Sequence, residues 1–366
     1  MNKAYFRKVK VIKKYIAIFV VSCFGGWIFS SIHFPIPWTL GPLATVMIVK
    51  IAYHRQVYWP MKIRNIAMLV IGYVMGSPFT PQTGHRILSQ VPALLIMTFI
   101  TIALCLIGGS IIGRYLHLHQ STSLLGSLPG GLQQMTMVCE DVEGSDAAVV
   151  TIMQTARLLV TVFTVPFLVL HGLADHVDPI RSAAAQFNID TFPILALFGF
   201  IIVISIFIAK YINFPSPYLT APVISTAILV LSGVDAPSLP YFVIALAQVC
   251  ISIRMGMSVD VAKMHNWGKL LLLTISSIFV VILLLLGVDY LFAQISGSPF
   301  ITAFISTAPG GITEMGLTAM MVHADLSTVI AFQLVRLLFV LLVAIPVITW
   351  WLRHKNKQVV RFSPLE

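Results

Sequence analysis

Charged side chains are scarce in this chain. Only 10% of its 366 residues are Asp, Glu, Lys or Arg, whereas a soluble domain carries about 25%. Hydrophobic residues make up 58% of the chain, and the mean hydropathy is +0.94. This composition excludes a soluble domain of useful size and predicts an all-α, polytopic transmembrane helical bundle.

Apolar runs long enough to cross a hydrocarbon layer of about 30 Å recur along the whole chain. The basic N-terminal stretch leads into the first run, which we expect to be a span and not a signal peptide, because a related run lies mid-chain. The predicted spans are residues 15–32, 37–53, 64–80, 91–113, 147–171, 192–211, 217–233, 239–257, 269–292 and 327–352.

Cysteine is also rare, and the four cysteines are scattered without a Cys-x-x-Cys pair or a disulfide framework. The ten histidines are spread over the spans and loops. A metal centre for oxygen chemistry needs clustered histidine and carboxylate ligands. We therefore expect no metal and no cofactor, and the absence of a phosphate-binding G-x-x-x-x-G-K-[ST] stretch gives no indication of an ATPase.

Acidic residues are fewer than basic ones, 13 against 23, which gives a net charge of +10. The basic residues lie at span ends and in short loops, and they do not form a basic domain. This distribution indicates membrane topology and not a nucleic-acid partner. The expected surroundings are a lipid bilayer, and a homo-oligomer is left open.

The chain carries an internal duplication. "HFPIPWTLGP" at 33–42 aligns with "NFPSPYLTAP" at 213–222, and "GSLPGGLQQM" at 126–135 aligns with "STAPGGITEM" at 306–315, both at the same spacing. After a slip of one position, Gln154 and Arg157 meet Gln333 and Arg336. We predict two homologous membrane repeats, residues 1–180 and 181–366.

The distribution of lysine and arginine favours inverted repeats. If each half has five spans and its Pro-Gly-Gly segment dips in and returns, only Arg86 and Arg181 fall outside, while Arg157 and Arg336 lie within the membrane. Six crossings per half would move more basic residues outside. We therefore predict a bacterial inner-membrane protein with cytoplasmic N- and C-termini and one re-entrant Pro-Gly-Gly hairpin in each half.

The two Pro-Gly-Gly segments are the first candidate site. Broken helices at matching places in inverted repeats are typical of the substrate site of a transporter, because non-helical backbone at membrane depth must be buried in protein or line a wet cavity. A tight turn between spans is the alternative. The segment residues predicted to bind substrate are Ser127, Pro129, Gly130 and Gly131 in the first half and Thr307, Pro309, Gly310 and Gly311 in the second. The serine and threonine hydroxyls are expected to cap the following helix or to contact the ligand.

Gln154, Arg157, Gln333 and Arg336 are the second candidate set. A charged side chain inside a span is unfavourable by about 3 kcal/mol or more unless it faces protein, water or a partner. The arginines could bind a carboxylate or another anion. Alternatively, each arginine could hydrogen-bond the carbonyl groups of the broken hairpin in its own half. The sequence leaves both readings open.

Glu314 has Gln134 as its counterpart in the first half, so the two halves differ here. A carboxylate beside a broken helix could bind a coupling proton or sodium ion. It could equally compensate the charge of Arg336.

The repeated "LPGGLQQM" and "APGGITEM" motifs, each followed by a Gln-x-x-Arg helix, resemble the AbrB-type duplicated bacterial membrane proteins over about residues 15–352. Members are labelled as regulators or as ammonia monooxygenases, and the resemblance itself implies no settled activity. Because the chain has no helix-turn-helix pattern, we do not expect it to bind DNA. We predict secondary transport of a small anionic metabolite by alternating access. The alternatives are a membrane-embedded sensor or regulatory subunit that affects gene expression indirectly and, with less support, an ammonia-monooxygenase-like enzyme.

Overall fold

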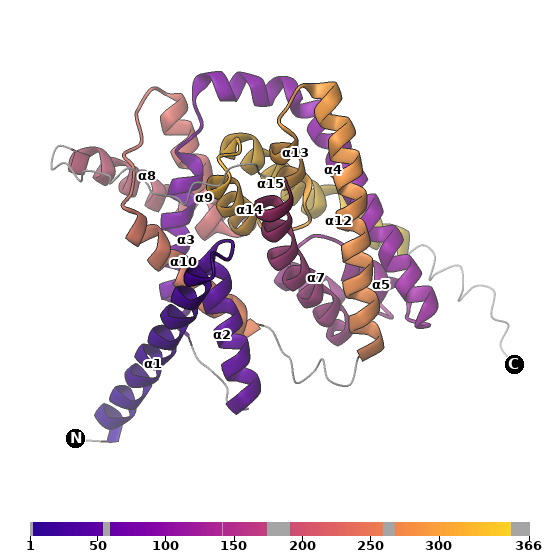
Figure 1. Ribbon diagram of the computed structural model, residues 1–366, viewed down its shortest axis with the longest axis horizontal. Helices are drawn as coiled ribbons and strands as arrows, with labels where there is room; N and C mark the ends of the chain where they lie inside the picture. The colour runs from indigo at the N-terminus through magenta and orange to yellow at the C-terminus, as the bar shows by residue number, and fades with distance from the viewer. Residues whose placement is uncertain (1–2, 54–58, 141, 174–190, 259–267, 353–366) are drawn as a thin grey trace, which may run out of the picture. The chain divides into compact units, whose positions relative to one another are not determined.

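The computed structural model describes residues 3–53, 59–140, 142–173, 191–258 and 268–352. Every regular element in these ranges is a helix (Figure 1). The predicted all-α fold class is confirmed for this part of the chain, and long apolar sequences account for it, since a helix satisfies all its backbone hydrogen bonds internally.

Among the described residues, seven helices are long and apolar enough to cross a membrane. The chain is therefore a multi-span membrane protein. The seven candidates are Lys14–Ser31 within α1 (Lys3–Ser31), Ser89–Tyr115 within α4 (Pro81–Tyr115), Ala147–Leu173, formed by α7 (Ala147–Leu168) and a π-helical turn (Val169–Leu173), α8 (Phe192–Tyr211), α10 (Tyr241–Ser258), α12 (Gly268–Ser296) and Leu326–Leu352, which starts with α15 (Leu326–Phe339).

The other three predicted spans coincide with shorter helices, α2 (Pro37–Tyr53), α3 (Met61–Gly76) and α9 (Pro217–Leu231). The number of crossings and the sidedness stay predictions. Large apolar side chains on the outer faces, such as Phe99 of α4 and Phe207 of α8, are more than 60% exposed, which suits contact with lipid.

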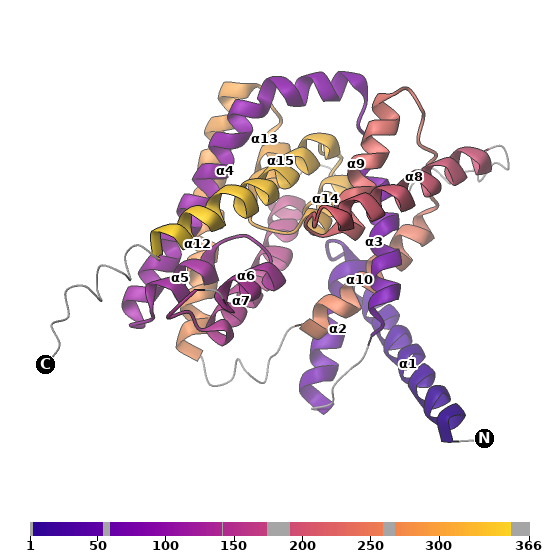
Figure 2. The ribbon, with the colours of Figure 1, turned by 180° about the vertical axis from the view of Figure 1, so that it is seen from behind.

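The chain forms two compact units. Unit 1 comprises Met1–Ser89, Pro166–Val261 and Gly316–Thr328. Within it, α2 packs against α1 and α10, and α3 packs against α9 and α10 (Figures 1 and 2). Gly76 of α3 faces the Val223 carbonyl of α9, and Gly256 of α10 faces the Leu43 carbonyl of α2. A Cβ atom at either glycine would lie less than 3 Å from the carbonyl oxygen, so only glycine permits these helix contacts.

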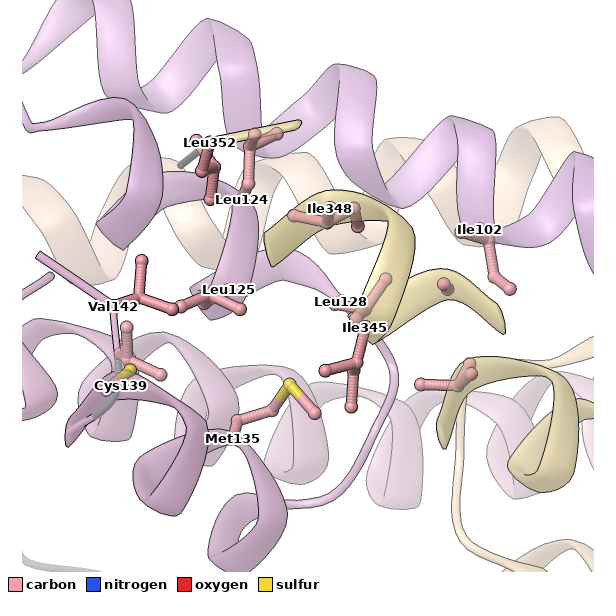
Figure 3. Close-up of a cluster of buried hydrophobic side chains, with 13 residues drawn as sticks. Ile102, Leu124, Leu125, Leu128, Met135, Cys139, Val142, Ile345, Ile348 and Leu352 are labelled. Carbon is pink, nitrogen blue, oxygen red and sulfur yellow. The ribbon is translucent and has the colours of Figure 1, made fainter. Parts of the chain in front are cut away.

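Unit 2 comprises Gln90–Val165, Ala262–Met315 and Val329–Glu366. Most of α4 lies in it, along α12, with α5 (Gln120–Ser127), α6 (Leu132–Glu140), α13 (Phe300–Thr307) and the start of α14 (Ile312–Met321). An apolar cluster joins α5 and α6 to the end of the last span, with Leu128, Met135 and Ile345 among its buried members (Figure 3).

A π-helical turn at Val340–Ala344 precedes Pro346 in this last span. Proline has no N–H and its ring crowds the carbonyl four residues earlier, which favours such a turn. A Cβ atom on Gly130 would lie 3.0 Å from Val340 Cγ1, so the turn packs directly on the first Pro-Gly-Gly segment.

Each compact unit takes segments from both predicted repeats, so the units do not coincide with residues 1–180 and 181–366. The repeats are defined by similarity of sequence, whereas the units are defined by contact in space. The duplication therefore stays a prediction.

Candidate functional site

Each Pro-Gly-Gly segment separates two short helices. Residues 128–131 lie between α5 and α6, and residues 308–311 lie between α13 and α14. The residue before each proline has extended backbone, with ψ of 128° and 132°, which is the conformation that a following proline favours. In both segments, the N–H of the first glycine donates to the carbonyl two residues earlier, at 2.8 Å. The two breaks therefore share this local geometry up to the first glycine, whereas the second glycine is left-handed in the first segment, at Gly131 with φ of 87°, and not at Gly311.

Ser127 and Thr307 end the helices that precede the breaks. The Ser127 hydroxyl donates to the Leu124 carbonyl at 3.1 Å. The Thr307 hydroxyl donates to Asp289 Oδ2 at 2.6 Å. Among the described residues, neither hydroxyl has a hydrogen bond to the helix that follows the break, and contact with a ligand stays a prediction. Both residues belong to the last helical turn before the break, where a hydroxyl meets the carbonyl three residues earlier or a neighbouring helix.

In the first half, Gln154 and Arg157 of α7 hold the end of α5. Gln154 Nε2 donates to the carbonyl groups of Leu125 and Leu128, both at 2.9 Å. Arg157 donates to the Leu128 carbonyl at 2.6 Å and lies 3.5 Å from the Ser127 carbonyl. The last carbonyl groups of a helix have no partner within the helix. The buried side chains of Gln154 and Arg157 therefore satisfy them.

In the second half, Gln333 and Arg336 of α15 donate hydrogen bonds to the last carbonyl groups of α13. Gln333 Nε2 lies 3.1 Å from the Ser306 carbonyl and 3.2 Å from that of Ile305. Arg336 donates to the carbonyl groups of Thr307, Ala308 and Gly310 and to Gln333 Oε1. Arg336 thus makes more hydrogen bonds than Arg157. The reading in which each arginine supports the backbone of its own segment agrees with these contacts.

The two guanidinium groups are buried and close enough for their charges to interact, and the buried, uncharged thiol of Cys105 on α4 lies near both. Within the described part of the chain, neither arginine is paired with a carboxylate, and Arg157 Nε has no hydrogen-bond partner. Among the described residues, the two positive charges of unit 2 therefore have no direct ion pair with an acid.

Glu314 lies in the first turn of α14 and is only 6% exposed. Its carboxylate lies against the backbone of Gly311. A negative side chain is favourable at a helix N-terminus, where backbone N–H groups have no partner within the helix. The side chain of Gln134, its predicted counterpart, lies outside the described residues.

Unit 2 contains every residue that the sequence predicts for the site. The set is Ser127, Pro129, Gly130, Gly131, Gln154, Arg157, Thr307, Pro309, Gly310, Gly311, Glu314, Gln333 and Arg336. Their roles in substrate or ion binding stay predictions.

A model of the family described as "Transition state regulatory protein AbrB" matches residues 38–352, which is most of the chain. The chain belongs to the AbrB family. It is 25% identical over 349 residues to "Uncharacterized protein YhjN" of Bacillus subtilis (strain 168), a match that covers 88% of each chain. It is 24% identical over 314 residues to "Putative regulator AbrB" of Escherichia coli (strain K12), covering 86% of this chain and 89% of the relative.

One polar group of this AbrB-family protein is absent from the sequence prediction. Asp289 lies in α12, is fully buried, and accepts the hydrogen bond from Thr307. The signal was present in the sequence, because Asp289 is the single acid in the apolar run 269–292, and an ionisable residue inside a span indicates a functional site. A comparison of the two halves does not reveal it, because the equivalent position of the first half holds Gly109.

A cavity of about 550 Å³ lies elsewhere in unit 2, at the end of α4, and Arg114, His117 and Gln120 are among its lining residues. It contains none of the predicted site residues. In the described ranges, no three His, Cys, Asp or Glu side chains gather in an arrangement that could hold a metal ion.

Proposed function

We propose that this AbrB-family protein is a secondary transporter that moves a small anionic metabolite by alternating access. The observation that carries the proposal is the pair of buried arginines in unit 2, which lie close together without a carboxylate partner among the described residues. Each arginine donates hydrogen bonds to backbone carbonyl groups where one helix ends and the next has not begun. Broken helices of this kind line the substrate sites of many transporters.

An anion would compensate an unfavourable charge distribution. A buried charge at membrane depth is unfavourable by about 3 kcal/mol or more, and two positive charges near each other add repulsion. Carbonyl groups offer dipoles to Arg157 and Arg336 but no net negative charge. A carboxylate or similar anion near them would supply that charge, and the N-terminus of α6 would favour it too.

The proposed inverted duplication has support from paired contacts in unit 1. Gly76 approaches the carbonyl of Val223, and Gly256 approaches the carbonyl of Leu43. At the spacing that aligns the two halves, Gly76 corresponds to Gly256 and Val223 corresponds to Leu43. Exchanging the two halves therefore converts one contact into the other. A two-fold relation between the halves would produce such an exchange, and an inverted repeat with re-entrant hairpins has this symmetry.

A membrane-embedded sensor is the second candidate function, because the Escherichia coli relative carries the name "Putative regulator AbrB". Such a protein would bind the same anion and pass the signal to a partner without moving the anion across the bilayer. Flux through the purified protein distinguishes the two functions.

Anion binding is tested first by thermal shift of the detergent-purified protein against small carboxylates, amino acids and inorganic anions. We expect at least one carboxylate to stabilise it, because a ligand at a concentration of 100 times Kd adds about 2.7 kcal/mol to the free energy of unfolding. Arg157→Lys should weaken this shift, since lysine keeps the charge but loses the planar fork that matches a carboxylate.

Lys269→Ala is the matched control, because Lys269 is exposed at the start of α12, and it should keep the full shift. A panel without any stabilising anion would refute the anionic site. Binding without uptake of that anion into proteoliposomes would favour the sensor.

A further inference from the structure

Asp289 has a buried carboxyl group, and one of its two oxygens has no hydrogen-bond partner in the described structure. It lies in α12, a strongly apolar candidate span. Asp289 Oδ2 accepts from the Thr307 hydroxyl at 2.6 Å, whereas Oδ1 is buried and has no hydrogen-bond partner in the described structure. A buried carboxylate oxygen without a donor is unfavourable, so this position calls for a cation or a proton.

We propose that Asp289 binds and releases the proton that drives transport, an inference that rests on the proposed transport function. In this step, a proton adds to the free carboxylate oxygen Oδ1 and gives the neutral acid. The proton leaves to water on the other side of the membrane in the alternate state. No other reactant is needed.

The contacts around Thr307 favour a proton over a metal cation. A hard cation needs several oxygen ligands. The carbonyl groups at the end of α13, from Ile305 to Ala308, already accept hydrogen bonds from Gln333 and Arg336. A proton, in contrast, requires only the free oxygen of Asp289.

The elements near Asp289 carry few other titratable groups. Thr307 on α13 is its hydrogen-bond donor, and Thr101 of α4 lies 3.5 Å from the Thr307 carbonyl. Cys105 of α4 packs on Leu285, one helical turn before Asp289. Arg336 reaches the same Thr307 carbonyl from α15. In the described structure, neither Cys105 nor Arg336 bonds Asp289, and the printed contact of its carboxyl group is the hydrogen bond from Thr307.

Thr307 also connects the proton to the substrate region. Its hydroxyl contacts Asp289, and its carbonyl contacts Arg336, which in turn holds Gly310 of the second segment. When Asp289 is neutral, its pull on the Thr307 hydroxyl weakens, and the position of the segment changes with it. Through these contacts, protonation of Asp289 affects the backbone segment that we propose contacts the substrate.

The first half offers no equivalent proton site. Gly109 and Ser127 occupy the positions that align with Asp289 and Thr307. A Cβ atom on Gly109 would overlap the Ser127 side chain, so no aspartate fits there. We therefore expect one Asp289-type proton per cycle.

Two measurements test the inference with Asp289→Asn, which keeps the size of the side chain and an oxygen that can accept from Thr307. Infrared difference spectra of the purified protein between low and high pH should show a protonated carboxyl band that Asp289→Asn abolishes and Glu314→Gln retains. A band that is absent from the wild type, or lost in Glu314→Gln instead, would overturn the assignment to Asp289. This measurement does not depend on transport.

The second measurement is uptake of radiolabelled succinate, glutamate and citrate into proteoliposomes with the membrane potential clamped. One pH unit should support about a tenfold accumulation per coupled proton. Asp289→Asn should abolish the accumulation but keep exchange between labelled and unlabelled substrate. Undiminished accumulation in the variant, or accumulation driven by sodium alone, would overturn the coupling role. No flux in the wild type would instead refute the proposed transport, and the infrared band would still decide whether Asp289 titrates.

Discussion

Arg336→Leu is expected to lower the free energy of unfolding by about 3 kcal/mol or more, because each buried acceptor that loses its donor costs about 1–3 kcal/mol. Arg336 donates to the carbonyl groups of Thr307, Ala308 and Gly310. Leucine fills a similar volume but donates nothing. Tryptophan fluorescence during heating in detergent measures the loss as a melting temperature several degrees lower.

Arg157→Leu is the matched comparison, and its effect should be clearly smaller. Arg157 has one short bond, to the Leu128 carbonyl, and its Nε has no partner among the described residues. Its removal also relieves the repulsion on Arg336, since the two charges interact. The double variant should therefore be less stable than wild type by less than the sum of the two single effects.

The ranking of the two variants decides the role of the arginines. A wild-type melting temperature for Arg336→Leu would show that its hydrogen bonds to the segment do not support the fold. An effect of Arg157→Leu as large as that of Arg336→Leu would contradict the different bonding of the two side chains. Arg336→Lys should fall between wild type and leucine, because lysine retains the charge and can reach some of the carbonyl groups.

Helix positions were predictable from the sequence because apolar runs of span length have few alternatives. The ends of the helices were less predictable than their positions. The run predicted at 15–32 continues backwards to Lys3 in α1, since a basic stretch can be helical without being apolar. The run predicted at 64–80 stops at Gly76 in α3. There Pro78 has no N–H to donate to the Val74 carbonyl, which accepts from the Ser77 hydroxyl instead.

The candidate site was only partly predictable. The Pro-Gly-Gly breaks and the intramembrane arginines stand out because such residues are unfavourable in a span. The sequence could not decide which groups the arginines contact, because their partners at the ends of α5 and α13 belong to other helices, far earlier in the chain. Asp289 was hidden for the opposite reason, since comparison of the two halves emphasises what they share and Asp289 is present in one only.

The contacts of Gly76 lead to the second large effect. In a helix interior, alanine is normally more stable than glycine by about 1 kcal/mol. At Gly76 the sign should reverse, because a Cβ atom would lie 2.6 Å from the Val223 carbonyl oxygen and 2.7 Å from Thr226 Cβ. Both distances are shorter than van der Waals contact, and one of the opposing atoms belongs to the backbone. The helices α3 and α9 would have to separate along their contact.

We therefore expect Gly76→Ala to destabilise the protein by about 1–3 kcal/mol, the usual range for overpacking, and Gly76→Leu to destabilise it further. Gly199→Ala is the control in the same unit, since no atom lies within 4 Å of a Cβ at that position of α8. It should leave the melting temperature unchanged or raise it slightly. Equal melting temperatures for Gly76→Ala and Gly199→Ala would mean that the close contact of α3 and α9 is not needed.

Gly256→Ala extends the same experiment to the proposed duplication. Its Cβ atom would lie 2.8 Å from the Leu43 carbonyl oxygen and 3.0 Å from Val46 Cβ. Because these neighbours align with Val223 and Thr226 in the other half, a two-fold relation between the halves predicts similar losses for Gly76→Ala and Gly256→Ala. A loss at only one of the two glycines would show that the helix pairs α3·α9 and α2·α10 are not energetically equivalent. The exchanged contacts would then no longer support an inverted repeat. The transport proposal would lose the argument that rests on that repeat.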